Sequence, residues 1–475
     1  MMDCPYQQKG SGPSDAGPQT AAPTERISPG PRELVSLESH VDPLIFLGQL
    51  IERYGDVVRY QTRFGPCFLF IHPDHVQAIL HREKYRRASL VRMMLGDGLL
   101  ASDGPRWRSQ RRLMQRDFLP PSVTPYVSVM MRETARTAVA WQAAAEAGRA
   151  VDVTEEMTRL TLRIVVDALF SEDLSHERAT KLCGAITQTI SDLGKISWAV
   201  FGMPVQLAPG SSAHFAAGKE VIDAVCYDMI ARRQAQSPAD RPHDLLTMLV
   251  EAETADGPMT DRQLRDELVT MLVGGHETTA LALAWAWKAI AEHPEVEEKL
   301  HAELDAVLAG RPPGLEDMTS LPWTHAVFQE TMRLYPPVWH MARVATEDDV
   351  IDGHPIPRGS GVLLSAWFTH RHAAFWSEPE RFDPSRFMPS APSPPHRYAY
   401  FPFGGGRHQC LGMHFSLLEG TLILAQLGQT FCIRPLNGEQ VQPHPGITLR
   451  QSPGMRADVE MRRSDGGSPQ GRTAP

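Results

Sequence analysis

Residues 401–412 read FPFGGGRHQCLG, which is the most informative stretch of this sequence. Its three glycines predict a turning loop with exposed backbone amide groups, and the apolar run MHFSLLEGTLILAQL that follows predicts a helix. Amide donors and a helix N-terminus both favour a thiolate over a thiol. The loop therefore indicates that Cys410 is presented as a cysteinate to a metal.

Two other interpretations of this loop have less support. A lone cysteine is usually a small buried hydrophobic residue, but here three glycines and a helix start surround it. A dinucleotide site would need the pattern GxGxxG between a strand and a helix. Gln409 stands where the third glycine would be, and no strand-helix unit is predicted around it.

A long central helix is the clearest single element outside this loop. Thr260 and Gln263 form a capping-box pattern at its start, and Pro294 ends it at His293. At about 1.5 Å per residue, such a helix is ~50 Å long, which is enough to cross the molecule.

The centre of this helix carries GGHETT, residues 274–279. Two adjacent glycines cost a helix interior about 1 kcal/mol each relative to alanine, which indicates that something approaches the backbone closely at Gly274 and Gly275. The alternative is a helix-helix contact between small residues. A zinc protease is excluded, because HExxH would need a histidine where Ala280 stands.

A second helical pattern carries Glu330 and Arg333, three residues apart and so on one helix face. Such pairs are usually solvated and contribute little to stability. The apolar neighbours Val327, Phe328 and Met332 instead predict a buried pair, in which loss of one partner typically costs about 3–5 kcal/mol.

Composition excludes several functional classes. The 475 residues carry 47 Lys and Arg against 56 Asp and Glu, a net charge of -9, which argues against nucleic-acid binding. The six cysteines are scattered, which favours reduced thiols and a cytoplasmic location. No apolar run reaches 18 residues, so the sequence predicts no transmembrane anchor.

The chain is predicted to form one large domain between two disordered tails. Residues 1–31 are rich in proline and glycine, residues 32–460 contain no linker, and residues 461–475 form the second tail. Helical periodicity dominates the middle of the chain, whereas hairpin patterns occur near residues 57–70 and at Asp352-Gly353. A further strand region is predicted at residues 446–462. The fold class is therefore mainly α with small β-sheets.

Together these motifs resemble the cytochrome P-450 superfamily, the haem-thiolate monooxygenases, in its soluble bacterial type. The likeness covers roughly residues 30–460 and includes Trp107-x-x-x-Arg111 and Pro379-Glu380-Arg381-Phe382. One departure is His408, where the family often has arginine, although many bacterial members share the histidine.

The resemblance implies haem b as the cofactor, with Cys410 as the axial ligand of its iron. It assigns Trp107, Arg111, Arg343 and His408 to the haem propionates and places Phe403 beside the sulfur. Gly274 and Gly275 are expected to let the central helix pass over the haem, where Glu277 and Thr278 relay protons to oxygen. Glu330 and Arg333 are expected to be structural. The implied substrate pocket contains Leu100, Gly274, Val338 and Ile447.

The implied activity is hydroxylation of a lipophilic molecule such as a terpenoid, steroid, fatty acid or polyketide. Because no flavin or nicotinamide motif occurs, electrons should come from a ferredoxin or flavodoxin with an NAD(P)H-dependent reductase. Residues 82–116 hold ten Lys and Arg against three acids, and this basic stretch suits an acidic electron carrier. A monomer is expected. A peroxide-using or rearranging haem enzyme and a non-catalytic haem carrier are the alternatives, both disfavoured by the intact Glu277-Thr278 pair.

Overall fold

The protein is described from a computed structural model that covers residues 28–31, 42–62, 65–87, 91–200, 211–254, 257–436 and 440–462. Of the tails expected at residues 1–31 and 461–475, residues 1–27 and 463–475 lie outside these described residues. Residues 28–31 lie against the first strand, where the Pro29 carbonyl accepts a hydrogen bond from the Arg59 amide (2.8 Å). Among the described residues, no helix is long and apolar enough to cross a membrane.

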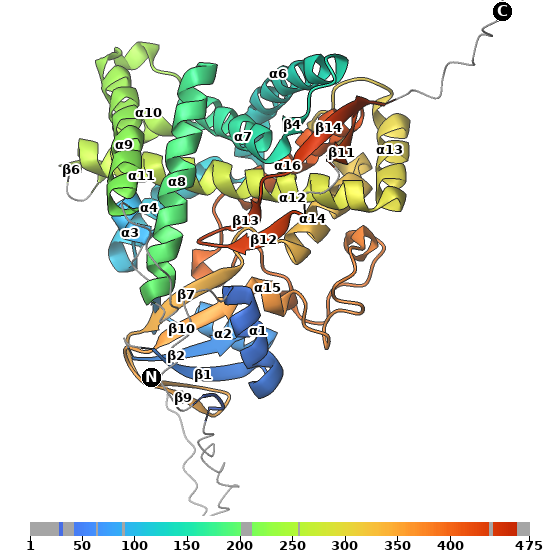
Figure 1. The fold of residues 1–475 in the computed structure, drawn as a ribbon. Helices are drawn as coiled ribbons and strands as arrows, with labels where there is room; N and C mark the ends of the chain where they lie inside the picture. Colours follow the sequence, from blue (N-terminus) through green and yellow to red (C-terminus); the bar gives the residue numbers. More distant parts are fainter. Residues whose placement is uncertain are drawn as a thin grey trace, which may run out of the picture.

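Helices make up most of the structure, as the sequence predicts (Figure 1). They are α1 (Pro43–Tyr54), α2 (Pro73–His81), α3 (Arg92–Leu95), α4 (Gly104–Met114), α5 (Pro120–Val123), α6 (Val127–Glu146), α7 (Val153–Phe170), α8 (His176–Val200), α9 (Ser211–Ala235), α10 (Leu245–Val250), α11 (Asp261–Leu272), α12 (Thr278–Glu292), α13 (Pro294–Leu308), α14 (Pro322–Leu334), α15 (Ala366–Thr369) and α16 (Met413–Gly428). One large hydrophobic core joins the central helices.

The strands form small sheets. They are β1 (Val57–Thr62), β2 (Gly65–Phe70), β3 (Tyr85–Arg87), β4 (Val151–Asp152), β5 (Glu253–Thr254), β6 (Gly257–Pro258), β7 (His340–Ala345), β8 (Asp349–Ile351), β9 (His354–Ile356), β10 (Gly361–Ser365), β11 (Phe431–Pro435), β12 (Gln442–Pro445), β13 (Leu449–Ser452) and β14 (Arg456–Met461). The largest sheet has the order β1-β2-β10-β7-β3, in which β2 and β10 run parallel. This sheet joins strands from both halves of the chain.

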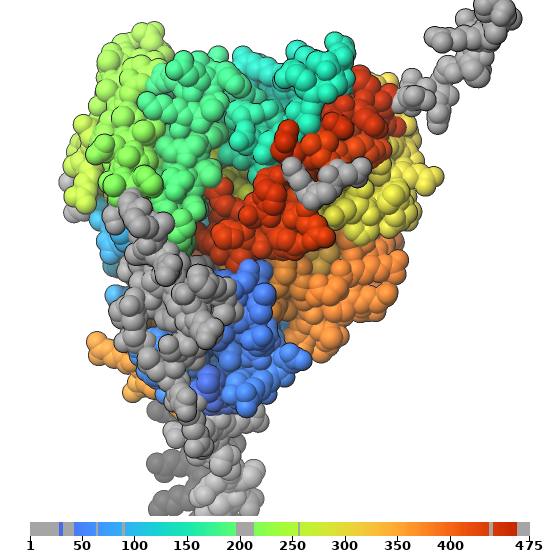
Figure 2. All heavy atoms as spheres, viewed as in Figure 1, coloured from blue at the N-terminus to red at the C-terminus, as the bar shows by residue number. Residues whose placement is uncertain are grey.

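The hairpins predicted from the sequence are present. β1 and β2 pair antiparallel, and β8 and β9 pair around Asp352 (φ 45°) and Gly353 (φ 78°), the two positive φ values of a type I′ turn. The C-terminal strand region consists of β13 and β14, in two different sheets. In Figure 2 this C-terminal segment, in red, lies between the green helices and the blue and orange part that holds the largest sheet.

The central helix begins and ends as predicted but is not a continuous α-helix. The capping box at Thr260 and Gln263 starts α11, and α12 ends at Glu292. Between them, Val273–Glu277 form a π-helical turn. Such turns are often found at functional sites. The two glycines permit the π turn here, since the backbone is least constrained by side chains at these positions.

Candidate functional site

The cysteine loop is a tight turn held by its own backbone. The Gly404 amide donates to the Phe401 carbonyl, and the Cys410 amide donates to the Phe403 carbonyl, both at 2.9 Å. Gly404 (φ 68°) and Gly406 (φ 62°) have left-handed conformations that favour glycine. The sequence prediction of a turning loop before a helix is confirmed, with α16 starting at Met413.

The loop also fits closely against the rest of the protein. A Cβ atom at Gly406 would clash with the Leu80 carbonyl at the end of α2, and one at Gly405 would clash with the Tyr398 ring. The Tyr398 hydroxyl accepts from the Gly406 amide (3.3 Å) and hydrogen-bonds to His81 Nε2 (2.6 Å). The glycines are therefore required by close packing as well as by the turn.

Cys410 remains accessible although protein surrounds its sulfur. Its side chain is exposed, although Phe401 and Gly405 of the same loop are buried. Surrounding protein removes water from the thiol and raises the pKa of Cys410, whereas the Gly412 amide and the charge of Arg111 lower it. A thiol that is both accessible and surrounded by protein suits a ligand that enters the interior and displaces its proton.

Arginines converge beside this loop. Arg87 and Arg343 lie directly opposite each other on the antiparallel strands β3 and β7, and only 13% and 7% of their side chains remain exposed. Like charges placed opposite each other destabilise a sheet. Arg111 on α4 donates to the Gln409 carbonyl (2.9 Å), next to Cys410. An anion bound beside these arginines would offset their positive charge.

Histidine and tryptophan complete the cation cluster. His408 packs edge-on against Trp107 on α4, with ring centroids 4.3 Å apart, and its Nε2 lies 3.3 Å from Asp103. Burial and the charge of Arg87 lower the pKa of His408 to about 3, and the same causes lower the pKa of Arg343 to about 10. Burial is the main cause of both shifts and the neighbouring arginine charge adds to it; the two carboxylates of a haem would offset this positive charge.

These observations test whether the chain fits haem. Three buried or half-buried arginines, a histidine and an accessible cysteine meet at one loop, and Asp103 is the acid that contacts them. The donor set fits a cofactor that carries one metal and two carboxylates. Sequence reasoning assigned Arg111, Arg343, His408 and Trp107 to this cluster. It missed Arg87, whose signal was its place in the basic stretch of residues 82–116.

The glycines of the π turn have different surroundings. A Cβ atom at Gly274 would meet nothing within 4 Å, whereas one at Gly275 would lie 2.9 Å from Val165 on α7. Gly274 is exposed, and its carbonyl accepts a hydrogen bond from the Thr278 hydroxyl (2.9 Å). Gly274 and Thr278 therefore border open space, while Gly275 serves a helix-helix contact, which was the alternative for this pair.

Glu277 is buried and held by the C-terminal hairpin. Its carboxylate forms an ion pair with Arg450 and accepts from the Thr448 hydroxyl (3.1 Å), both near β13. Thr278 instead bonds back along its own helix. The two residues expected to act together thus have separate partners, and neither Arg450 nor Thr448 could be linked to Glu277 from the sequence.

The segments that hold the expected pocket residues are fixed by backbone hydrogen bonds. The Leu99 amide, beside Leu100, donates to Glu267 on α11 (2.9 Å). Val338 and Ile447 come close because the Leu449 amide donates to the Pro337 carbonyl (2.9 Å). Leu100, Val338 and Ile447 all retain exposed surface. The resemblance also implies that residues 195–205 line the pocket, and residues 201–205 of this stretch lie outside the described residues.

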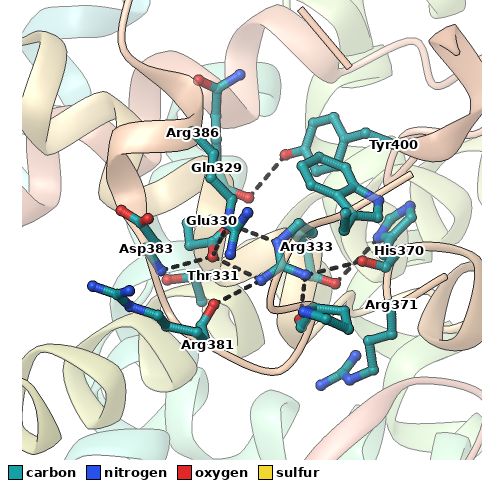
Figure 3. A network of polar contacts seen from close by, with 12 residues as sticks. Gln329, Glu330, Thr331, Arg333, His370, Arg371, Arg381, Asp383, Arg386 and Tyr400 are labelled. Carbon is teal, nitrogen blue, oxygen red and sulfur yellow. Dashed lines mark hydrogen bonds and ion pairs between the residues drawn. The ribbon is translucent and has the colours of Figure 1, made fainter. Parts of the chain in front are cut away.

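Glu330 and Arg333 form a fully buried ion pair on α14. Their side chains are 0% exposed, and two hydrogen bonds of 2.6 and 2.8 Å join them. Arg333 also donates to the carbonyls of His370, Pro379 and Arg381, as Figure 3 shows around this pair. The burial predicted from the apolar neighbours is confirmed. The pair holds residues 370–383 against α14.

His370 connects this ion pair to the cysteine loop. The Phe401 amide, at the start of the loop, donates to His370 Nε2 (2.9 Å), and His370 Nδ1 lies 3.3 Å from the Arg333 carbonyl. Burial, together with the charge of Arg333, lowers the pKa of His370 to about 3. The imidazole therefore stays neutral and can accept the Phe401 hydrogen bond. This residue was also missed from the sequence.

A helical domain with small sheets and a glycine-rich cysteine loop beside a cation cluster defines the class of haem-thiolate proteins. The chain belongs to the cytochrome P450 family, whose model matches residues 33–455, and it is a cytochrome P450 monooxygenase. The haem iron with a cysteine thiolate ligand follows from the family. The fold resembles the crystal structure of the cytochrome P450DA haem domain, with a TM-score of 0.81 at 22% identity, covering 93% of this chain and 99% of that one.

Similar proteins include bacterial oxygenases. Cyclooctatin synthase of Streptomyces melanosporofaciens is 34% identical over 86% of this chain and 90% of its own. Cyclooctat-9-en-7-ol 5-monooxygenase of the same organism is 34% identical over 83% of this chain and 86% of its own. Pentalenene oxygenase of Streptomyces avermitilis is 29% identical over 81% of this chain and 85% of its own.

Proposed function

We propose that this chain binds haem b through Cys410 and hydroxylates a lipophilic molecule with electrons from a separate carrier. The observation that carries the proposal is the like-charge pair Arg87 and Arg343, together with Arg111 at the loop of the exposed Cys410. Haem bound by a thiolate supplies dioxygen activation, because the sulfur donates electron density to the iron. Arg87, Arg111, Arg343, Trp107 and His408 would hold its two carboxylates.

Proton transfer is proposed for Glu277, the last residue of the π turn, and Thr278, the first residue of α12. The Thr278 hydroxyl lies at the open side of the helix and donates its proton to the Gly274 carbonyl (2.9 Å). Its oxygen can accept a hydrogen bond from a group in the gap, and the hydroxyl would have to release Gly274 before it could donate there. Glu277 is a buried acid one residue away. Its carboxylate would have to break the ion pair with Arg450 to exchange a proton with Thr278. Gly274 keeps the gap open because it has no side chain.

The substrate is proposed to be a hydrocarbon-rich ring compound of the terpene class. The relatives named for cyclooctat-9-en-7-ol and pentalenene support this class. The expected lining residues Leu100, Val338 and Ile447 are apolar, which suits a ligand recognised by shape and burial. Terpene hydrocarbons and terpene alcohols are therefore the first compounds to test, ahead of steroids, fatty acids and polyketides.

The electron carrier is proposed to dock on the outer face of α4. Trp107 and Arg111 of this helix face the haem-binding cluster, whereas Arg108 and Arg112 are exposed. An acidic ferredoxin or flavodoxin would meet these outward charges and stand one helix away from the cofactor. Neutralising Arg108 and Arg112 together should slow reduction at low salt and change it little at high salt.

The central test is the carbon-monoxide difference spectrum of the reduced, haem-loaded protein. The wild-type chain should show the strongly red-shifted band of thiolate ligation. Cys410→Ala should lose this band, while the matched variant Cys432→Ser should keep it. A wild-type band at the position of histidine ligation, or a Cys410→Ala variant that keeps the red-shifted band, would overturn the proposal.

Substrate class is tested on the same preparation. Terpene hydrocarbons and alcohols, steroids and fatty acids are titrated separately while the spin state of the iron is followed by absorbance. A spin shift with terpenes, followed by a mono-oxygenated product with reconstituted carriers, is the expected result. Turnover that needs only peroxide, or a rearranged product without an added oxygen atom, would favour the alternative haem-thiolate activities.

A further inference from the structure

A second group of metal-ligating side chains lies far along the chain from the cysteine loop. Among the described residues, Glu297, His301 and Cys432 bring one carboxylate oxygen, one imidazole nitrogen and one sulfur within 4.8 Å of one another. All three are partly buried. None of them takes part in the haem-binding arrangement described above.

Two rigid elements position these ligands. Glu297 and His301 are four residues apart on α13, so they lie one above the other on the same helix face. Cys432 is the second residue of β11, whose neighbour is β14, and it pairs in register with Glu460. Ligands on a helix and a sheet strand are held more precisely than ligands on loops.

A neighbouring arginine orients the carboxylate of Glu297. Arg434 Nη1 donates to both oxygens of Glu297, at 2.8 and 3.0 Å. Asp305, one further turn along α13, is paired with Arg462 at 2.8 Å. One carboxylate oxygen of Glu297 could therefore bind a metal while the other keeps its hydrogen bond to Arg434. Hydrogen bonds of this kind commonly orient the side chains that bind a metal.

We propose that Glu297, His301 and Cys432 form a binding site for a zinc-type divalent metal ion, separate from the haem. Sulfur, imidazole and carboxylate together match the preference of Zn²⁺ over Mg²⁺ or Ca²⁺, which take oxygen ligands. Three protein ligands leave a fourth tetrahedral position for water.

Proton release accompanies binding at this site. The metal binds the thiolate, so the Cys432 thiol gives its proton to solvent as the sulfur-metal bond forms. Burial and the charge of Glu297 raise the pKa of Cys432, and burial together with Arg462 lowers the pKa of His301. The charged groups that face these ligands are Glu297, Asp305, Arg434, Glu460 and Arg462.

The test uses zinc chloride with the full-length, haem-loaded protein after treatment with a chelator. One zinc per chain should remain bound through gel filtration, as counted by elemental mass spectrometry. Zinc should also protect Cys432 from N-ethylmaleimide, as read by peptide mapping. His301→Ala and Cys432→Ser should each weaken zinc binding by at least ~10-fold, the effect expected of a lost ligand. The matched control is His214→Ala, an exposed histidine on α9.

The haem spectrum provides a separate check of folding in every variant. If the variants keep their thiolate-ligated spectrum but lose zinc, the site is established without reference to oxygenase activity. Zinc bound equally by the wild type, His301→Ala and Cys432→Ser would be adventitious and would overturn the proposal. Labelling of Cys432 at the same rate with and without zinc would overturn it as well.

Discussion

At the scale of single residues, the most consequential contact is the ion pair between Glu277 and Arg450. Glu277 is 1% exposed, so its charge depends on Arg450 and on the hydroxyl of Thr448. A buried carboxylate that loses its partner keeps the cost of desolvation without the compensating attraction. The proton transfer proposed for Glu277 would therefore require this ion pair to open.

We predict that Arg450→Gln lowers the free energy of unfolding by about 3 kcal/mol, because it leaves a buried charge unpaired. Glu277→Gln should restore part of this loss, since the double variant contains no unpaired charge. The measurement is a double-mutant cycle in urea, with an expected coupling of about 1–3 kcal/mol. Strictly additive effects of the two substitutions would show that the ion pair does not stabilise the fold.

The chemistry of a residue could be predicted from the sequence where it depends on residues nearby in the chain. The thiolate environment of Cys410 and the burial of the Glu330-Arg333 pair follow from adjacent residues, and the latter is confirmed. The partners Arg87, His370 and Arg450 were not predicted. Each is brought to its site by a strand or turn that is remote in sequence, so no local pattern marks it.

At the scale of elements, the two adjacent glycines of the π turn have different roles. Gly275 lets α7 approach the central helix, whereas Gly274 faces open space. The sequence predicted the bounds of this long helix from its caps, because capping is local. It did not predict the π turn, since two glycines permit but do not require a change of hydrogen-bond pattern.

We predict opposite outcomes for alanine at these two positions. Gly275→Ala should lower the free energy of unfolding by about 1–3 kcal/mol through overpacking against Val165. Gly274→Ala should leave stability unchanged or raise it by up to ~1 kcal/mol, because alanine is the better helix former, yet shift the absorbance spectrum of the bound haem. Thermal unfolding and absorbance check both. Equal destabilisation by the two variants would contradict this division.

A second element-scale feature is the attachment of residues 97–99 to α11. The Asp97 amide donates to Asp266 (2.8 Å), and the Leu99 amide donates to Glu267 (2.9 Å). Burial raises the pKa of Glu267 to about 7. Because the carboxyl takes up protons more readily in the folded than in the unfolded chain, its stabilising contribution is present below about pH 4.5 and is lost as pH rises through about 7.

We predict that Glu267→Gln removes this pH dependence while its amide oxygen still accepts the Leu99 hydrogen bond. Relative to the wild type, the variant should gain about 2–3 kcal/mol of stability between pH 5 and pH 8, since each pKa unit corresponds to about 1.4 kcal/mol. Urea unfolding at both pH values measures this. Parallel stability curves for the two proteins would contradict the assignment.

At the scale of the whole molecule, the fold class was predictable and the site was predictable only in part. Hairpins, helix caps and the cysteine loop are local patterns, and the structure has them where expected. The largest sheet is different, because β2 pairs with β10 across almost 300 residues. Pairing at that distance depends on the complete core, and the meeting of Arg87 with Arg343 is one result of it.

Buried histidines are expected to make the whole molecule sensitive to acid. Burial lowers the pKa of His370 to about 3 and that of His340 to about 4. The unfolded chain binds these protons near pH 6.5 and the folded chain does not, so stability is present above pH 6.5 and falls as pH drops toward these values. Each histidine contributes about 1.4 kcal/mol per pH unit in that range.

We predict that His340→Gln and His370→Gln each flatten the loss of stability between pH 6.5 and pH 5 by about 1.4 kcal/mol per pH unit. The slope of the free energy of unfolding against pH is compared, rather than its value, because either substitution also changes packing. Urea midpoints at several pH values give the slopes, and His214→Ala, at an exposed position, should keep the wild-type slope. Unchanged slopes in the two buried variants would contradict the expectation.

The cysteine loop is held from distant parts of the chain, and this has a consequence for biosynthesis. His81 contacts Tyr398, and Arg111 contacts Gln409 across 298 residues. A ribosome makes the chain from its N-terminus, so the arginines exist long before the cysteine that completes their site. Contacts at such separation form late in folding. Cofactor binding through Cys410 therefore cannot precede the synthesis of this residue, and nascent chains that end before Cys410 should not retain haem through a thiolate.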